Sequence, residues 1–374
     1  MTMVQSEGTV APDMIKPPRA LVGPVAWLRQ NLFSSPHNSF LTLVSLWLTY
    51  AFLSSFLSWA LFSAVFTGAD GKACSVEGAG ACWPFITAKF GQFMYGRYPD
   101  AERWRVNLTY ALAAAGLVPL LIPSVPGKTW QAVYVFVVFP VIAFFLLTGG
   151  VLGLPYVETQ FWGGLLVTLV VATVGITMSF PIGVALALGR RSQMPLVKIA
   201  SVGFIEFVRG VPLITVLFMS SVMLPLFLAP GTHVDKLLRA LIGVSLFSGA
   251  YMAETVRAGL QAIPRGQFEA ADALGLSYGK KMRLIILPQA LKVVIPNIVS
   301  EFIGLFKDTS LVLIIGLFDL LGIVQQNQAD PKWNSPSTAM TGYVFAAAVF
   351  WLFCFAMSRY SAFVERNLAT GEKR

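Results

Sequence analysis

The segment QFEAADALGLSYGKKMRLIILPQA, residues 267–290, interrupts a chain whose other long segments are almost entirely apolar. It starts acidic and rich in alanine, reaches Gly275 and then turns basic. Six charged side chains lie between residues 264 and 283, and each would cost about 2.5–3.5 kcal/mol at the centre of a bilayer. We therefore predict that this segment is a cytoplasmic loop between two membrane spans.

Local propensities predict a helix, a turn and a second helix in this loop. Residues 269–274 favour a helix, and Gly275 can take the positive φ that often ends one. Ser277 can then cap a second helix that runs toward Pro288. One apolar edge would fit a groove on another protein: Phe268, Ala271, Leu274 and Leu276. The same pattern is also typical of an amphipathic loop that rests on the membrane surface.

The composition requires a membrane protein. Of the 374 residues, 56% are hydrophobic and 12% are charged, which is too apolar for a soluble domain. Apolar runs of about 20 residues match helices that cross the hydrocarbon, and they lack the alternation of outer-membrane strands. The net charge of +9 lies in clusters at the ends of these runs, so cytoplasmic loops explain it better than nucleic acid binding does.

Eight spans are expected, so we predict an all-α integral membrane fold with both termini on one side. The spans are placed at residues 40–66, 106–124, 129–148, 161–189, 200–228, 237–260, 294–316 and 340–359. Basic clusters after the fourth and sixth spans and at both ends of the chain assign the termini to the cytoplasm. One loop argues mildly against this topology, because it is predicted to be periplasmic and yet holds five basic residues: Lys72, Lys89, Arg97, Arg103 and Arg105.

Charged residues inside apolar runs become common only after residue 158, which suggests a division of the chain. The expected parts are a cytoplasmic tail at 1–39, an accessory membrane region at 40–157 with a periplasmic loop at 67–105, a working core at 158–365 with a cytoplasmic loop at 261–293, and a cytoplasmic tail at 366–374.

Cysteines and histidines give little sign of chemistry. Cys74 and Cys82 share a polar loop and would form a disulfide if that loop faces an oxidising compartment, which their spacing leaves open. Cys354 lies in an apolar run and is expected to be a small core residue. No cluster of Cys, His and carboxylates has metal-ligand spacing, and no nucleophile stands beside a base. We therefore expect no metal, no bound cofactor and no catalytic site.

The opening segment resembles a family motif. In this segment Glu269-Ala270-Ala271 is followed after three residues by Gly275, after nine more by Ile285, and after one more by Leu287-Pro288. This spacing is similar to the complete EAA motif of permease subunits of bacterial ATP-binding-cassette (ABC) importers. Segments around it resemble the polar amino acid uptake subfamily, the histidine/glutamine permease group: FIEFVRGVPLI at 204–214, SGAYMAETVRAGLQAIPRGQ at 248–267, LPQALKVVIPN at 287–297 and KDTSL at 307–311. This resemblance covers about residues 161–365. The loop sequences ACWPFITAKF, GRYPD and ERWRVN resemble the second permease subunit of general L-amino acid transporters of Gram-negative bacteria.

The resemblance implies a type I ABC importer permease core of five helices, preceded here by three additional helices. It implies four kinds of partner: a homologous permease subunit, two ABC ATPase subunits that bind ATP and Mg, a periplasmic amino-acid-binding protein, and the lipid bilayer. Residues 261–293 would be a coupling loop in a groove of the ATPase, with Glu269 on its basic surface and Gly275 at the turn. The other coupling residues would be Arg265, Gly266, Ala270, Ala271, Ile285, Leu287 and Pro288.

Binding of ATP would make the two ATPase subunits dimerise, and this movement would drive an alternating-access cycle. The chain's own Gly-Lys-Thr at residues 127–129 has Ile122 where a P-loop needs its first glycine, so it is not a nucleotide site.

Two pairs of opposite charges lie in apolar spans at i, i+3 spacing: Glu206 with Arg209, and Glu254 with Arg257. Charges at such depth are costly in lipid, so both pairs should face the bundle interior or water. They would either line a path for the zwitterionic head of an amino acid, or have a structural role as interhelical salt bridges or as anchors at the cytoplasmic end. We prefer the structural role for Glu254 and Arg257, which lie near the loop, and leave Glu206 and Arg209 undecided.

Three further charges interrupt the seventh span. Glu301 has no basic residue within one helical turn, which makes it the best single candidate for a substrate-path residue. Lys307 and Asp308 are also candidates, although the two would neutralise each other if they pair.

Two other classes of function compete with an ATP-driven importer. An ion-coupled secondary amino acid transporter would need an intramembrane carboxylate and would have no use for the EAA loop. A membrane scaffold or sensor would not need charges at several depths in its core.

Overall fold

The computed structural model describes residues 23–151, 153–229 and 231–369, and within these ranges the chain is helical apart from isolated β-bridges. Contacts divide it into two compact units. The first comprises the chain up to Ala64 together with Gly78–Ala81, and the second comprises Val65–Glu77 together with the chain from Cys82 onward. Most of the expected N-terminal tail and the last five residues of the C-terminal tail lie outside the described residues.

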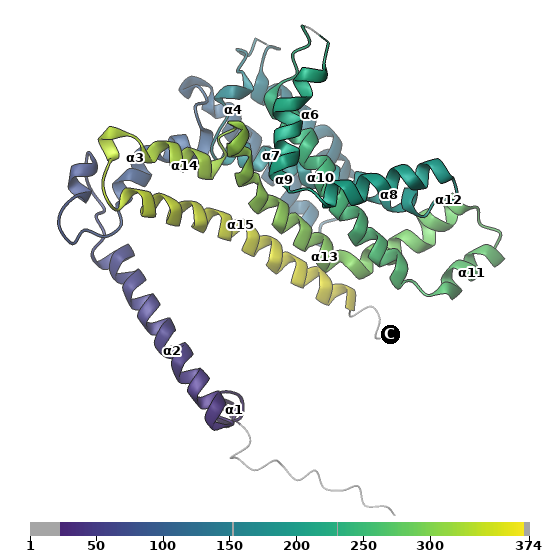
Figure 1. Ribbon diagram of the computed structural model, residues 1–374, viewed down its shortest axis with the longest axis horizontal. Coiled ribbons are helices and arrows are strands. Elements are labelled where there is room, and N and C mark those ends of the chain that lie inside the picture. The colour runs from purple at the N-terminus through teal and green to yellow at the C-terminus, as the bar shows by residue number, and fades with distance from the viewer. Residues whose placement is uncertain (1–22, 152, 230, 370–374) are drawn as a thin grey trace, which may run out of the picture. The chain divides into compact units, whose positions relative to one another are not determined.

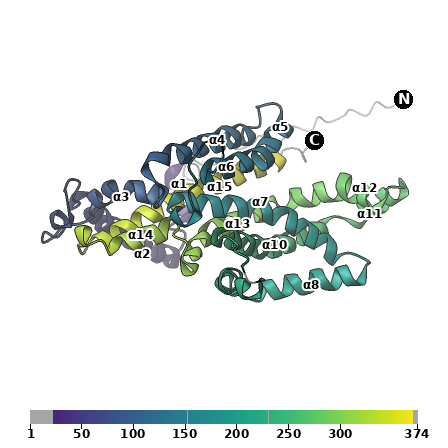
Figure 2. The same cartoon turned by 90° about the horizontal axis from the view of Figure 1, so that it is seen from above.

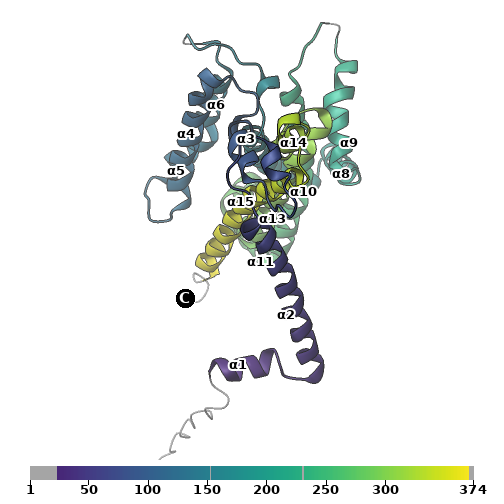
Figure 3. The same cartoon turned by 90° about the vertical axis from the view of Figure 1, so that its left-hand side faces the viewer.

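The first unit is a long apolar helix preceded by a short one. α1 (Pro24–Asn31) lies across the end of α2 (Pro36–Leu57), and a π-helical turn at Ser58–Phe62 extends α2 (Figure 3). Ser35 caps α2, because its hydroxyl accepts a hydrogen bond at 3.1 Å from the backbone N–H of Asn38. Over its whole described length α2 buries no side chain, so its apolar surface is suited to lipid.

The second unit is built around four long helices that follow one another side by side (Figures 1 and 2). These are α7 (Leu165–Arg190), α10 (Lys236–Ala262), α13 (Leu287–Asp308) and α15 (Thr338–Ala369). Glycines bring α7 and α10 close together. A Cβ on Gly183 would lie 2.5 Å from Met252, and one on Gly249 would lie 2.5 Å from Ile182.

Six described helices are long and apolar enough to cross a membrane: Pro36–Phe62, Asp100–Leu121, Lys128–Thr148, Leu165–Arg190, Lys236–Ala262 and Thr338–Leu368. The expected seventh span corresponds to α13, which contains Glu301, Lys307 and Asp308, and to the 3₁₀ turns at Thr309–Ile315 that follow it. All-helical membrane architecture is therefore observed, with one departure in the fifth span.

The fifth span is broken. α8 (Pro195–Arg209) and the segment Leu213–Phe227, which begins with α9 (Leu213–Phe218), are bent by 108°. The predicted span at residues 200–228 therefore corresponds to two helices with a sharp bend between them. Pro212 stands at the break, where it has no N–H to continue the helical hydrogen bonds.

The accessory region forms a helical hairpin made of α4 (Arg103–Leu121), α5 (Lys128–Val133) and α6 (Phe139–Thr148). Arg105 is fully buried where the hairpin meets the core. Its Nε donates to the Leu146 carbonyl oxygen at 2.6 Å, and its Nη1 donates to the Pro155 carbonyl oxygen at 3.0 Å. These bonds satisfy two of the guanidinium nitrogens and hold the end of α6 to the chain that follows it, and Glu102 Oε2 lies 3.3 Å from Nη1 as the opposite charge.

Part of the loop at residues 67–105 folds against the core. Cys74 and Cys82 form a disulfide, with their Cα atoms 5.6 Å apart. α3 (Trp83–Tyr95) follows it and packs on α14 (Leu320–Gln328) and on α15. Lys89 Nζ lies 2.5 Å from Asp330 Oδ2, and this hydrogen bond lowers the pKa of the Asp330 carboxyl. We call this disulfide-bonded segment with α3 the cap.

Replacing Cys74 with Ser is expected to destabilise the cap, because loss of a disulfide typically costs about 2–4 kcal/mol of unfolding free energy. Thermal unfolding in detergent should give a lower Tm for Cys74→Ser and for reduced wild-type protein. Cys354→Ser changes the cysteine outside the disulfide and serves as the control. An unchanged Tm in both the substituted and the reduced protein would contradict this prediction.

Candidate functional site

The loop at residues 261–293 contains the expected first helix and turn. α11 covers Arg265–Ala273, and Gly275 follows with a φ of +67°. The Gly275 N–H donates to the carbonyl oxygen of Asp272 at 2.9 Å, which closes the end of the helix. Glycine takes this left-handed conformation without the steric cost that a Cβ would add.

The second helix of the loop is shorter than expected. α12 covers only Tyr278–Lys281, and a π-helical segment at Met282–Ile286 then leads into α13. Ser277 occupies the N-cap position, but its side chain makes no capping hydrogen bond. Instead, an ion pair at 2.5 Å between Lys281 Nζ and Asp272 Oδ1 connects the two helices across the turn.

The apolar edge expected on this loop is divided between two directions, so the prediction of one docking edge is wrong. Phe268 packs against the core and Ala271 is buried. Leu274 is 75% exposed. Tertiary packing uses the first two side chains to attach the loop to its own bundle, which leaves Glu269 and Ala270 on the exposed side. We call Glu269, Ala270 and Leu274 the docking face.

The remaining residues of the motif are also divided between surface and core. Ile285 and Leu287 are half-buried and pack against the same core cluster as Phe268. Four predicted coupling residues are exposed: Arg265, Gly266, Gly275 and Pro288. The motif therefore combines a solvent-facing surface with an anchor to the helices behind it.

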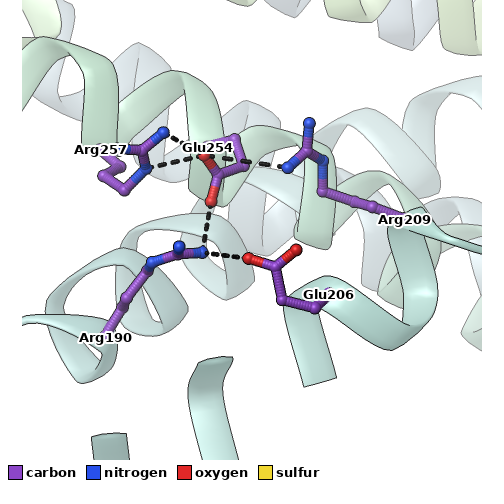
Figure 4. Close-up of polar contacts among 5 residues, drawn as sticks. All are labelled: Arg190, Glu206, Arg209, Glu254 and Arg257. Atoms are coloured by element: carbon purple, nitrogen blue, oxygen red, sulfur yellow. Dashed lines mark hydrogen bonds and ion pairs between the residues drawn. The ribbon is translucent and has the colours of Figure 1, made fainter. Parts of the chain in front are cut away.

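Five charged side chains from α7, α8 and α10 meet in one group, which we call the charge cluster (Figure 4). Glu254 is at its centre, and 14% of its side chain is exposed. Its Oε1 lies 2.7 Å from Arg190 Nη1, and its Oε2 lies 2.6 Å from Arg257 Nη2. Arg209 Nη1 is farther from that Oε2, at 3.8 Å. Arg190 Nη1 also contacts Glu206 Oε1 at 3.0 Å.

The fold merges into one cluster what the sequence suggests are two separate pairs. Glu254 contacts Arg257 at the expected spacing. Glu206 contacts Arg190, which was not predicted as a site residue, and not its expected partner Arg209. Three guanidinium groups share two carboxylates, so positive charge is in excess. The available signal was the doublet of Arg190 and Arg191, which the sequence alone explains as a marker of topology.

A cavity of about 210 Å³ lies between α7, α10 and α13. It is lined by Ser179, Phe247, Ser248, Tyr251, Met252, Glu301, Phe302, Gly304, Leu305 and Asp308. Sites for drug-sized ligands have roughly 300–1,000 Å³, so this cavity suits a small molecule. Two of the predicted path residues, Glu301 and Asp308, line it. Sequence reasoning missed Ser179, Ser248 and Tyr251, which have no charge to mark them in an apolar run.

Glu301 is less isolated than its sequence neighbours suggest. Thr255 on α10 and Arg209 on α8 both lie near enough to its carboxylate to interact with it. Lys307 is exposed and attracts Asp308. Among the described residues, however, no direct ion pair joins Lys307 to Asp308.

The arrangement can bind polar groups. Across the part of the chain that the structure describes, no group of three His, Cys, Asp or Glu side chains is arranged to hold a metal ion. The cavity offers carboxylates, hydroxyls and aromatic rings, which are groups that recognise a small charged ligand.

Comparison with known proteins identifies a family. Residues 179–370 match the binding-protein-dependent transport system inner membrane component. The chain is 54% identical over 347 residues to the inner membrane amino-acid ABC transporter permease protein YhdY of Escherichia coli (strain K12), covering 93% of this chain and 94% of that one. It is 40% identical over 430 aligned positions to the glutamate/glutamine/aspartate/asparagine transport system permease protein BztC of Rhodobacter capsulatus, covering 96% of this chain and 98% of that one. A solved amino acid ABC transporter with histidines is 30% identical, with a TM-score of 0.48, and the match covers 55% of this chain and 92% of that chain.

Both relatives match over nearly their whole length, so the likeness includes the accessory region as well as the core. The family match itself contains the loop at residues 261–293, the charge cluster and the cavity. These matches confirm the resemblance seen at the EAA motif. The chain therefore belongs to the family of binding-protein-dependent transport system inner membrane components, the permease subunits of ABC importers, which are transport components rather than enzymes.

Proposed function

We propose that this chain is the subunit through which an ATP-driven importer moves L-amino acids across the bacterial inner membrane by alternating access. The observation that carries the proposal is the coupling loop at one end of the core (Figure 1), whose docking face is exposed while Phe268 and Ala271 attach it to the bundle. The names of the two relatives, both amino acid permeases, support amino acids as the cargo.

The importer would need partners to supply energy and substrate. Two ABC ATPase subunits would bind ATP and Mg, a homologous permease subunit would complete the path, and a periplasmic amino-acid-binding protein would deliver substrate. The docking face combines the Glu269 carboxylate with the exposed apolar side chain of Leu274. Such a combination suits a partially apolar groove with a basic rim on the ATPase.

The cavity between α7, α10 and α13 would form part of the substrate path. Glu301 and Asp308 can attract the ammonium group of an amino acid, and Arg209, near Glu301, can attract its carboxylate. Glu206, Glu254 and Arg257 belong to the charge cluster and do not line the cavity. We therefore do not propose them as residues that contact the substrate.

An ion-coupled secondary transporter would also use carboxylates such as Glu301 and Asp308 within the membrane. Membership of the ABC importer family favours ATP as the source of energy and gives the coupling loop a purpose. A test of the proposed function therefore begins with the coupling loop.

Glu269→Arg should uncouple uptake from ATP hydrolysis. Juxtaposed like charges at an interface cost several kcal/mol, so the docking face would repel a basic ATPase groove and uptake should fall about tenfold or more. Uptake of radiolabelled L-amino acids and ATP hydrolysis are measured in vesicles that contain the full importer. Glu365→Arg, a reversal at an exposed site on α15, is the matched control. Wild-type uptake by Glu269→Arg would remove the coupling hypothesis.

Glu301→Gln should weaken substrate recognition, because the amide keeps the shape of the side chain but loses the charge. A hydrogen bond to a charged group contributes about 1.5–3 kcal/mol, so the KM of uptake should rise about tenfold or more. Concentration-dependent uptake measures this change, with Glu365→Gln as the control. If KM and substrate range stay as in wild type, Glu301 is a structural residue.

The proposed topology places the cap outside the cell and the coupling loop inside. In a Cys354→Ser background, Gln92→Cys on α3 should react with a membrane-impermeant maleimide added to intact spheroplasts, whereas Gly279→Cys should react only after permeabilisation. Both positions are exposed, so access to the reagent depends on the side of the membrane. Labelling of Gln92→Cys only in permeabilised cells would disprove the assignment.

A further inference from the structure

Two adjacent arginines at the end of α7 contact different parts of the molecule. Arg190 belongs to the charge cluster, whereas Arg191 reaches the coupling loop. The guanidinium carbon of Arg191 lies 5.3 Å from the centroid of the Phe268 ring, and its Nη1 donates to the Leu260 carbonyl oxygen at 3.3 Å. Arg191 therefore ties α11 to α7 and to the end of α10.

Phe268 is the large side chain that α11 turns inward. It packs against a core cluster that includes Ile263 and Met282, while the adjacent Glu269 is exposed on the docking face. A partner that pushes on the docking face would therefore press Phe268 against the guanidinium of Arg191. The planar guanidinium stacks on an aromatic ring in a way that a lysine ammonium does not reproduce.

A second series of contacts runs from Arg190 to the cavity. Arg190 joins Glu254 at 2.7 Å, and Glu254 also attracts Arg209 at 3.8 Å. The guanidinium carbon of Arg209 lies 5.5 Å from the centroid of the Tyr251 ring, which forms part of the cavity wall. The peptide bond between Arg190 and Arg191 connects this series to the coupling loop.

We propose that Arg190 and Arg191 together form a relay that transmits movement of the coupling helix to the wall of the substrate cavity. The inference rests on the proposed function and deepens it. It assigns both arginines as positioning residues, because neither lines the cavity.

The charge cluster has the property that a relay requires, namely a second arrangement within reach. Glu254 has three guanidinium groups near its two carboxylate oxygens, and Arg209 is the one held most loosely. If the end of α7 moves with α11 and withdraws Arg190, Arg209 can move toward the carboxylate in its place. This exchange would change the position of the guanidinium that covers Tyr251, and with it the shape of the cavity.

A purely structural role for the same contacts makes a different prediction. Ion pairs that only tether helices would affect the amount of assembled importer, without linking the coupling loop to the cavity. A relay instead determines how many amino acids are imported for each ATP hydrolysed. That ratio is independent of how much importer assembles.

The experiment uses the complete importer in liposomes, with its ATPase, partner permease and binding protein, and measures ATP hydrolysis and uptake of a mixture of radiolabelled L-amino acids. Arg191→Lys keeps the charge and removes the stacked plane. Phe268→Leu keeps an apolar side chain and removes the ring. The matched control is Arg359→Lys, at an exposed position on α15.

Each single variant should lower import per ATP about fivefold or more, with normal co-purification of the ATPase. The double variant Arg191→Lys with Phe268→Leu should have an import per ATP no lower than that of the more impaired single variant, because both changes break the same contact. Glu254→Gln tests the other end of the relay and should lower the ratio in the same way. Arg359→Lys should keep the wild-type ratio.

Wild-type ratios in Arg191→Lys and Phe268→Leu would overturn the relay, and so would losses that simply add in the double variant. A wild-type ratio in Glu254→Gln would do the same, even if one of the other variants failed to assemble. In each of these cases the wild-type importer still takes up amino acids, so the proposed function stands. Absence of amino acid uptake by the wild-type importer would instead contradict that function.

Discussion

The close contact between α7 and α10 places the functional parts of the core. Gly183 and Gly249 sit where a Cβ would collide with the opposite helix, so the two backbones can approach only because these positions lack side chains. α7 supplies Ser179 to the cavity and α10 supplies Tyr251 to it. α7 ends at Arg190 in the charge cluster, and the next residue, Arg191, contacts the coupling loop. Separating the two helices would therefore disturb the cavity and its connection to the coupling loop together.

A second constraint on the structure is that charged side chains within an apolar bundle must lie near one another. An isolated charge in a bilayer is costly, and pairing or access to water reduces that cost. Glu254 and Arg190 reduce this cost by direct contact, and Glu301 lies near Thr255 and Arg209. The same groupings create polar surfaces within the bundle.

Much of the fold and part of the site could be predicted from the sequence. Long apolar runs with basic ends indicate membrane helices, and the positions of six such helices follow the prediction. Gly275 and the residues before it predict the end of α11, because helix termination depends on local backbone conformation. The size of the bend between α8 and α9 could not be predicted, since the run around Pro212 is apolar enough to be read as one span.

The division of the apolar edge on the coupling loop could not be predicted. Phe268 and Leu274 are both apolar, yet one packs on the core and the other is exposed. Which face of a short helix turns inward depends on the helices behind it, and periodicity alone cannot locate them. The meeting of Arg190, Glu206 and Glu254 was hidden for the same reason, because they lie on three different helices.

The sequence by itself determined that the chain is a helical membrane protein, and it predicts that residues 267–290 lie outside the membrane, because hydrophobicity and charge act locally and depend on composition and spacing. Its motif also indicated the family that the comparisons then confirmed. Only the tertiary structure decided which charges meet, which residues line the cavity and which side of α11 is free. These features are contacts between segments far apart in the chain, and their geometry arises from the packing of helices against one another.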